Sequence, residues 1–171
     1  MYETNIQPKF TAEAIQKRVT ELGTEIRRDA GDSEILLIGI LKDASIFLSD
    51  LLRAIDGPVR YDFVDVVRDE SDSGPAALEI DFLAHVEMRG RNVYLLKDVV
   101  ATGVIENYLL TQFRAKEPGS LKLVALLDRP DLRTVQLDVE FRAFVASAGI
   151  YVGYGLEHHG RHGNLPYIGI V

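Results

Sequence analysis

The sequence predicts an α/β protein with a mostly parallel central sheet flanked by helices. Two observations support this fold class. Short runs of almost purely apolar residues, such as Ile35–Ile40 and Leu121–Leu127, are typical of strands buried on both faces of a parallel sheet. Amphipathic helical segments separate these runs, and a strand–helix–strand order implies right-handed crossovers that place helices on both faces.

The first half of the chain begins with an arm over residues 1–10, which ends near Pro8. Thr11 is a suitable cap for a helix whose apolar residues recur at steps of four, three and four residues: Ile15, Val19, Leu22 and Ile26. We expect a strand over 35–40, a helix over 44–55, and alternating strand residues at Val59, Tyr61 and Phe63. A mobile loop over 68–77, with little apolar surface, precedes a further alternating segment at Leu78, Ile80 and Phe82.

The second half continues the alternation of strands and helices. We expect strands over 93–96, 121–127, 139–145 and 151–154. The one helix of this half begins near Val104 or Ile105, runs to about Lys116, and turns these side chains inward: Ile105, Tyr108, Leu109 and Phe113. The tail from His158 to Val171 is expected to wrap over the domain.

Composition limits the classes of protein that remain. The chain has 171 residues, of which 47% are apolar, and this fits a single domain over residues 1–171. No apolar run reaches the length that a membrane span needs. Cysteine is absent, which excludes disulfides and zinc–sulfur sites and makes the cytoplasm the default location. The formal net charge of −7 disfavours nucleic acid and anionic membranes as partners.

The functional candidates are the loops that follow the strands, because ligands of such sheets bind at the carboxyl ends of the strands. These loops lie at 41–45, 97–104, 128–130 and 155–163. They carry, or lie close to, the following stretches: Gly39-Ile40-Leu41-Lys42, Phe47-Leu48-Ser49-Asp50-Leu51, Arg89-Gly90-Arg91-Asn92-Val93, Lys97-Asp98-Val99-Val100-Ala101-Thr102-Gly103, Leu126-Leu127-Asp128-Arg129-Pro130, Val152-Gly153-Tyr154-Gly155-Leu156 and Asn164-Leu165-Pro166-Tyr167-Ile168-Gly169.

This ordered set of stretches resembles the hypoxanthine-guanine phosphoribosyltransferases over residues 5–171. The resemblance implies a type I phosphoribosyltransferase fold with a small hood built from the C-terminal and N-terminal segments. It also implies transfer of ribose-5-phosphate from phosphoribosyl pyrophosphate to a purine nitrogen, with magnesium on the pyrophosphate. Homodimers or homotetramers are common in the family, and we expect one of them here.

The central motif of the family is a strand with two acidic residues, followed by a turn that opens a helix. The resemblance assigns ribose and phosphate binding to Lys97, Asp98, Ala101, Thr102, Gly103, Val104 and Ile105. A turn of this kind holds a phosphate through backbone N–H groups and the helix N-terminus. The alternative interpretation of 97–105 is a plain strand–turn–helix connection.

Much of the chemistry of this motif is missing. Lys97 stands where the family has its first acid, and only Asp98 keeps its acidic character. Ala101 replaces the catalytic Asp, and a methyl group cannot accept a proton, so no catalytic residue is assigned. Ile105 falls where the family places a phosphate-binding Thr.

Other site positions also depart from the family pattern. Lys42 matches a lysine of the pyrophosphate loop, but Asp43 follows it in place of Gly. Lys42 is equally compatible with a solvated loop lysine. Glu157 occupies a magnesium-contacting Asp position, and Gly163 stands where an arginine grips pyrophosphate. Arg68-Asp69 aligns with the Ser-Tyr pair of the family's closing loop.

The purine pocket is better preserved. Arg129 replaces the family's purine-reading lysine, and a guanidinium can donate to both O6 and N7 of a 6-oxopurine. Alternatively, Arg129 forms a surface ion pair with Asp128 or Asp131. Ile150 occupies the position of the aromatic residue that stacks on the base, and the backbone of Tyr151 would read the other base edge. The ring of Tyr151 is a candidate replacement for stacking.

Three functions are compatible with these residues. The first is a purine-salvage hypoxanthine/guanine phosphoribosyltransferase-like protein that binds purine nucleotide or phosphoribosyl pyrophosphate, with weak or no transferase activity. The second is a non-catalytic, nucleotide-binding regulatory module of the same fold, and the third is a structural subunit. Lys97 would supply part of magnesium's charge, so we predict that magnesium is dispensable for binding. Lys97 could instead simply pair with Asp98 or Glu157.

Overall fold

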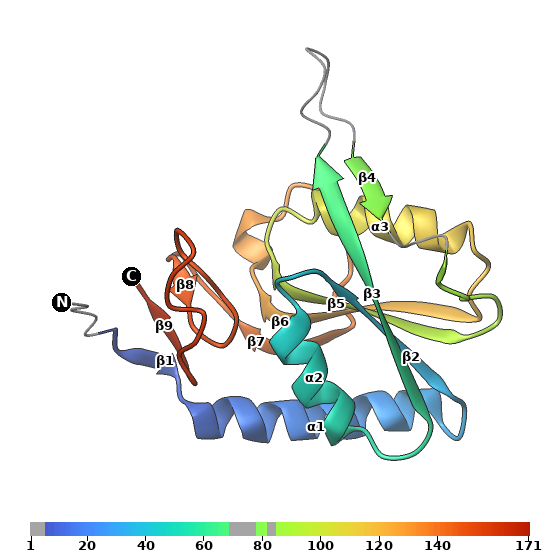
Figure 1. Ribbon diagram of the computed structural model, residues 1–171, viewed down its shortest axis with the longest axis horizontal. Coiled ribbons are helices and arrows are strands. Elements are labelled where there is room, and N and C mark those ends of the chain that lie inside the picture. Colours follow the sequence, from blue (N-terminus) through green and yellow to red (C-terminus); the bar gives the residue numbers. More distant parts are fainter. Residues whose placement is uncertain (1–5, 69–77, 82–84) are drawn as a thin grey trace, which may run out of the picture.

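The computed structural model describes residues 6–68, 78–81 and 85–171. The main sheet has six strands in the order β4-β3-β2-β5-β6-β7 (Figure 1). Their bounds are β2 Ile35–Ile40, β3 Val59–Arg68, β4 Leu78–Asp81, β5 Asn92–Val100, β6 Ser120–Asp128 and β7 Phe141–Val145. Every neighbouring pair is parallel except β3 and β4, which run antiparallel. The predicted α/β fold with a mostly parallel sheet is therefore confirmed.

Three helices cover the two faces of this sheet. Helices α1 (Ala12–Ala30) and α2 (Ser45–Ala54) share one apolar core with alternate residues of β2, β5 and β6, while α3 (Val104–Arg114) packs in a second core on the opposite face. All six residues of β2 are buried, because both cores need side chains from this central strand. The side chain of Thr11 caps α1 by accepting the N–H of Ala14 at 3.2 Å, as predicted.

A second sheet forms the hood from both ends of the described chain. Its order is β1-β9-β8, with β1 at Pro8–Phe10, β8 at Tyr151–Val152 and β9 at Ile168–Ile170, and all pairs are antiparallel. Figure 1 shows this sheet at the left of the main sheet, on the side where the carboxyl ends of the parallel strands lie. Tyr154 fastens the hood to α2 by donating its hydroxyl to Asp50 Oδ2 at 2.5 Å. The predicted arm and tail therefore contain paired strands.

The structure corrects four details of the predicted elements. Strand β7 begins at Phe141, two residues later than expected, and β8 ends at Val152 because Gly153 has a φ of 96°. Helix α3 ends at Arg114 and is rotated relative to the prediction. Its buried residues are Glu106, Leu109, Leu110 and Phe113, whereas Ile105 and Tyr108 are half-buried. Asp69 and the remainder of the expected loop to residue 77 lie outside the described residues.

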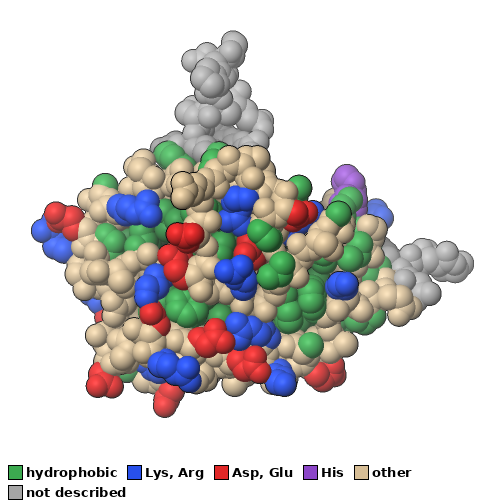
Figure 2. All heavy atoms as spheres, turned by 180° about the vertical axis from the view of Figure 1, so that it is seen from behind, with side chains coloured by type: hydrophobic (Ala, Val, Ile, Leu, Met, Phe, Trp, Pro, Cys, Tyr) green, Lys and Arg blue, Asp and Glu red, His purple; other side chains and the backbone are tan. Residues whose placement is uncertain are grey.

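Charged side chains of both signs lie on the face of the molecule shown in Figure 2. On the described part of the face shown in Figure 2, acidic and basic side chains are interspersed rather than gathered by sign. Among the described residues, no helix is both long and apolar enough to cross a membrane.

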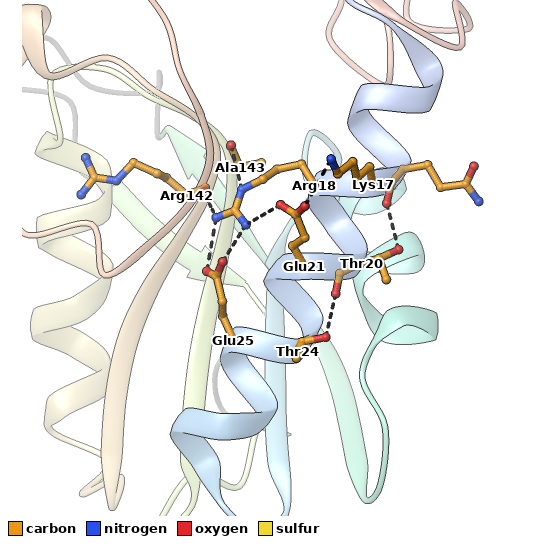
Figure 3. Close-up of polar contacts among 9 residues, drawn as sticks. Lys17, Arg18, Thr20, Glu21, Thr24, Glu25, Arg142 and Ala143 are labelled. Carbon is orange, nitrogen blue, oxygen red and sulfur yellow. Dashed lines mark hydrogen bonds and ion pairs between the residues drawn. The ribbon is translucent and has the colours of Figure 1, made fainter.

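Arg18 of α1 fastens this helix to strand β7, which is an edge of the main sheet (Figure 3). Its guanidinium donates to the carbonyls of Arg142 at 2.8 Å and Ala143 at 3.1 Å, and to Glu25 at 2.7 Å. These contacts satisfy backbone acceptors at the sheet edge, where no further strand supplies donors. Only 23% of the Arg18 side chain is exposed, so water replaces these bonds poorly when they are lost.

We predict that Arg18→Met lowers the free energy of unfolding by about 1–3 kcal/mol, because it removes charged hydrogen bonds from partly buried acceptors. Urea-induced unfolding measures this change. Lys17→Met is the matched control, since the Lys17 side chain is 80% exposed, and it should change stability by less than about 0.5 kcal/mol. Equal effects of the two substitutions would contradict the role given to Arg18.

Candidate functional site

The candidate site begins at the turn between β5 and α3. Gly103 is the N-cap of α3 and has a φ of 81°, a conformation that favours glycine. A Cβ atom there would also lie 2.9 Å from Cδ of Arg133, so space and backbone both demand glycine. The hydroxyl of Thr102 accepts the N–H of Val104 at 3.4 Å. The N–H groups at the N-terminus of a helix favour an anion without requiring a charged side chain.

Lys97 lies at the centre of the charged groups beside this turn. Its side chain is only 13% exposed, and its ammonium pairs with Asp98 and, at 3.3 Å, with Asp43 Oδ2. Burial alone would lower the pKa of Lys97, but the carboxylates of Asp98 and Asp43 outweigh it and raise the pKa. Lys97 is therefore a permanent cation shared between two carboxylates.

A second ion pair links the loop after β2 to the hood. The ammonium of Lys42 lies 2.9 Å from Glu157 Oε2, and this contact raises the pKa of Lys42. Gly163 makes room for the carboxylate, because a Cβ atom at residue 163 would lie 2.8 Å from Cγ of Glu157. Lys42 thus has a carboxylate partner, while 75% of its side chain is exposed, as expected for a solvated loop lysine.

Glu106 is a site residue that the sequence reasoning missed. It is 4% exposed on the first turn of α3, and burial raises its pKa. Lys97, Asp98 and Arg133 are the charged groups that act on it electrostatically. The spacing Glu106, Leu109, Leu110 and Phe113 is the i, i+3, i+4, i+7 pattern of one helix face, and this was the signal available in the sequence.

Arg129 follows β6 with a guanidinium that is largely enclosed. The side chain is 13% exposed, donates to the carbonyl of Gly149 at 3.2 Å, and lies 3.7 Å from Asp131 Oδ2. Its Nε is buried and has no hydrogen-bond partner. Of the two alternative ion pairs, the one with Asp131 forms, whereas the Asp128 carboxylate is bound by Arg133 and Arg142.

The other two predicted purine-site residues, Ile150 and Tyr151, differ in how far they are exposed to solvent. Ile150 is 48% exposed and is free to contact a ligand. The ring of Tyr151 is buried in the core, and its hydroxyl donates to the carbonyl of Ser147 at 3.2 Å. The ring of Tyr151 therefore does not replace the missing stacking residue, and only its backbone remains a candidate for reading the base.

The carboxylates at the site do not form a protein-held metal centre. Glu157 accepts the ammonium of Lys42, while Asp98 and Asp43 accept that of Lys97. Within the described ranges, no three His, Cys, Asp or Glu side chains converge to hold a metal ion. Each of these carboxylates has an ammonium partner on one of its oxygens, so a divalent cation would bind there in competition with a lysine.

Comparisons with known proteins agree with this geometry. The family model described as "Phosphoribosyl transferase domain" matches residues 10–158. A hypoxanthine-guanine phosphoribosyltransferase of Bacillus subtilis is 37% identical over 165 residues, which cover 95% of this chain and 91% of the relative.

Solved structures with similar folds come from proteins of the same kind. A hypoxanthine-guanine phosphoribosyltransferase of Bacillus anthracis superposes with a TM-score of 0.87 at 33% identity, covering 98% of this chain and 99% of its own. A mutant hypoxanthine phosphoribosyltransferase of Trypanosoma cruzi, complexed with the product IMP, gives a TM-score of 0.86 at 27% identity, covering 100% of this chain and 93% of its own. The chain therefore belongs to the hypoxanthine-guanine phosphoribosyltransferase family.

Proposed function

We propose that this chain binds a purine nucleotide, or phosphoribosyl pyrophosphate, in purine salvage, and that its phosphoribosyl transfer is weak or absent. The observation that carries the proposal is the buried Lys97 ammonium, shared by Asp98 and Asp43, beside Ala101. A positive charge and a methyl group stand where the transfer reaction needs carboxylates. A positioned acid or base commonly contributes about 10²–10⁴-fold to a rate, and Ala101 supplies none of this.

Binding is supported by the groups that remain. The turn at Thr102 and Gly103 keeps a left-handed glycine cap at the start of α3, and helix N-termini suit a phosphate. The guanidinium of Arg129, which follows β6, is a donor of the kind that suits O6 and N7 of a 6-oxopurine. The related Trypanosoma cruzi enzyme holds IMP. IMP and GMP are therefore the ligands that we propose.

Lys97 also bears on the role of magnesium. Its ammonium places a fixed positive charge beside the turn, and the neighbouring carboxylates are already paired. Compared with an acid at this position, the ammonium makes the local charge less negative, and this favours an anionic ligand. We propose that nucleotide binding depends little on divalent metal.

A second candidate function is a non-catalytic regulatory module that holds a nucleotide and reports its presence. It is favoured by the concurrent changes at Lys97, Ala101 and Gly163, which remove several polar groups of the reaction while leaving the phosphate turn intact. Residual transfer that rises when the acid is restored would favour a weakened enzyme. We further propose that the chain forms a single domain and is located in the cytoplasm. We also propose that it assembles into a homodimer or homotetramer, and light scattering would measure the mass of this assembly.

We predict that IMP binds with nearly the same affinity in excess magnesium chloride and in EDTA, within about threefold, or less than 1 kcal/mol. Isothermal titration calorimetry of the full chain measures both constants. Lys97→Glu should weaken binding and make it depend on magnesium, because the resident cation is replaced by an acid. An absolute magnesium requirement in the unaltered chain would refute the proposed role of Lys97.

We predict that transfer to hypoxanthine, guanine or xanthine is far slower than about 1 s⁻¹, an ordinary enzymatic rate. Ala101→Asp combined with Lys97→Glu should raise the rate, by up to the 10²–10⁴-fold that a general acid or base commonly contributes. Steady-state assays with phosphoribosyl pyrophosphate measure both, and Ala101→Asn is the control that restores size without a carboxylate. A rate of about 1 s⁻¹ or faster in the unaltered chain would disprove the weak-activity proposal.

We predict that Arg129→Met reduces the preference for IMP over AMP by at least about tenfold. The two ligands differ at position 6 of the base, where IMP offers an acceptor to the guanidinium and AMP offers an amino group, and a bidentate pair discriminates by about 1–3 kcal/mol. Competition titrations measure the ratio. Arg53→Met is the control, because the Arg53 side chain is 71% exposed on α2. An unchanged ratio would remove Arg129 from the purine site.

A further inference from the structure

The turn between β5 and α3 accepts hydrogen bonds on its backbone carbonyls from one short segment of the chain. Three successive carbonyls of the turn accept hydrogen bonds from residues 129–134. The bonds are Arg129 N–H to Val100 O at 2.9 Å, Arg133 Nε to Ala101 O at 3.0 Å and Thr134 N–H to Thr102 O at 3.0 Å. Two of these donors are backbone groups, whereas the middle one is a side chain.

Arg133 supplies the side-chain donor of this set, and all three nitrogens of its guanidinium donate hydrogen bonds. It is 14% exposed, and beyond Ala101 it donates to the carbonyls of Leu137 at 3.4 Å and Val100 at 3.5 Å. Its Nη2 also pairs with the carboxylate of Asp128, which is only 3% exposed. The planar fork of arginine suits several fixed acceptors, and this arrangement leaves the side chain little freedom.

The held carbonyls decide which way the peptide groups of the turn point. A peptide unit carries its C=O and N–H on opposite sides, so carbonyls bound behind the turn leave the N–H groups directed away from Arg133. A flipped peptide would instead present a partially negative oxygen to an anion. The side chain of Arg133 is also the closest neighbour of the position that a Cβ atom would take on Gly103, at 2.9 Å.

A second arginine, Arg142, binds Asp128 but does not bind the turn. Arg142 of β7 donates to Asp128 Oδ2 at 2.9 Å and to the carbonyl of Val139 at 3.1 Å. Its hydrogen bonds reach none of residues 100–103 within the described chain. Removal of Arg142 therefore deprives Asp128 of a partner without releasing a carbonyl of the turn.

We propose that Arg133 is a positioning residue that fixes the peptide orientation of the turn at Val100–Gly103 for a phosphate group. The proposal rests on the proposed function, in which this turn binds the phosphate of a nucleotide. Arg133 touches no ligand in this scheme. It acts through the carbonyls of Val100 and Ala101, and its effect is confined to ligands that carry the phosphate.

The test compares Arg133→Met with Arg142→Met, both as full chains. Titration calorimetry with IMP and with inosine separates the phosphate from the rest of the ligand. Arg133→Met should weaken IMP by about tenfold or more, as expected for loss of a charged hydrogen bond, and leave inosine within about threefold. Arg142→Met should change neither. Equal losses in both variants, or equal losses for both ligands, would show a merely structural role and overturn the proposal.

Hydrogen exchange on the ligand-free protein gives a readout that needs no nucleotide. The N–H of Thr134 is bonded to the turn, so Arg133→Met should speed its exchange by about tenfold or more relative to Arg142→Met, if the turn is released. Unchanged protection of Thr134 would overturn the proposal. Failure of the unaltered chain to bind IMP would defeat the proposed function, while the exchange result would still decide the role of Arg133.

A conservative variant covers the case in which Arg133→Met does not fold. Arg133→Lys keeps a cation for Asp128 but lacks the planar fork that reaches several carbonyls. It should fold, retain inosine binding, and lose part of the IMP affinity together with part of the Thr134 protection. Full IMP affinity in a folded Arg133→Lys variant with unprotected Thr134 would separate turn geometry from phosphate binding and refute the proposal.

Discussion

The buried ammonium of Lys97 is the constraint around which the rest of the site is arranged. A charge with so little access to water must be paired, and one carboxylate from its own strand does not satisfy all three of its protons. Asp43 supplies a second acceptor from the loop after β2, which ties that loop to β5. The neighbouring Lys42 then reaches the hood through Glu157. Two ion pairs from adjacent residues of the loop after β2 thus connect it to β5 and to the hood.

The departures from the family pattern are coupled in space. In the sequence, the departures from the family pattern look independent of one another; they lie at Lys97, Asp43, Glu157 and Gly163. In the structure, Lys97 contacts Asp43, and the missing side chain of Gly163 leaves the volume that Glu157 occupies. The first pair is an ion pair, whereas in the second pair a small residue leaves space for a larger neighbour.

Local pattern was enough to predict the main sheet, its helices and the position of the turn, because their apolar periodicity and the cap at Thr11 are local signals. It was not enough for β1 and β9, since each has three residues and is defined only by its partner far along the chain. The same limit explains Glu106 and Tyr151. Glu106 was not among the residues predicted to face inward on its helix, and the ring of Tyr151 was interpreted as a candidate ligand contact. Burial of both is decided by tertiary packing.

The pairing of β1 with β9 has a consequence for the order in which the protein folds. Strand β1 precedes α1, yet its partner β9 lies far along the chain. Since a contact of such long sequence separation is slow and entropically costly to form, we expect the hood to close after the central sheet. The contact between Lys42 and Glu157 depends on that closure. The scaffold is therefore complete before the candidate site, and only the fully folded chain can capture a ligand.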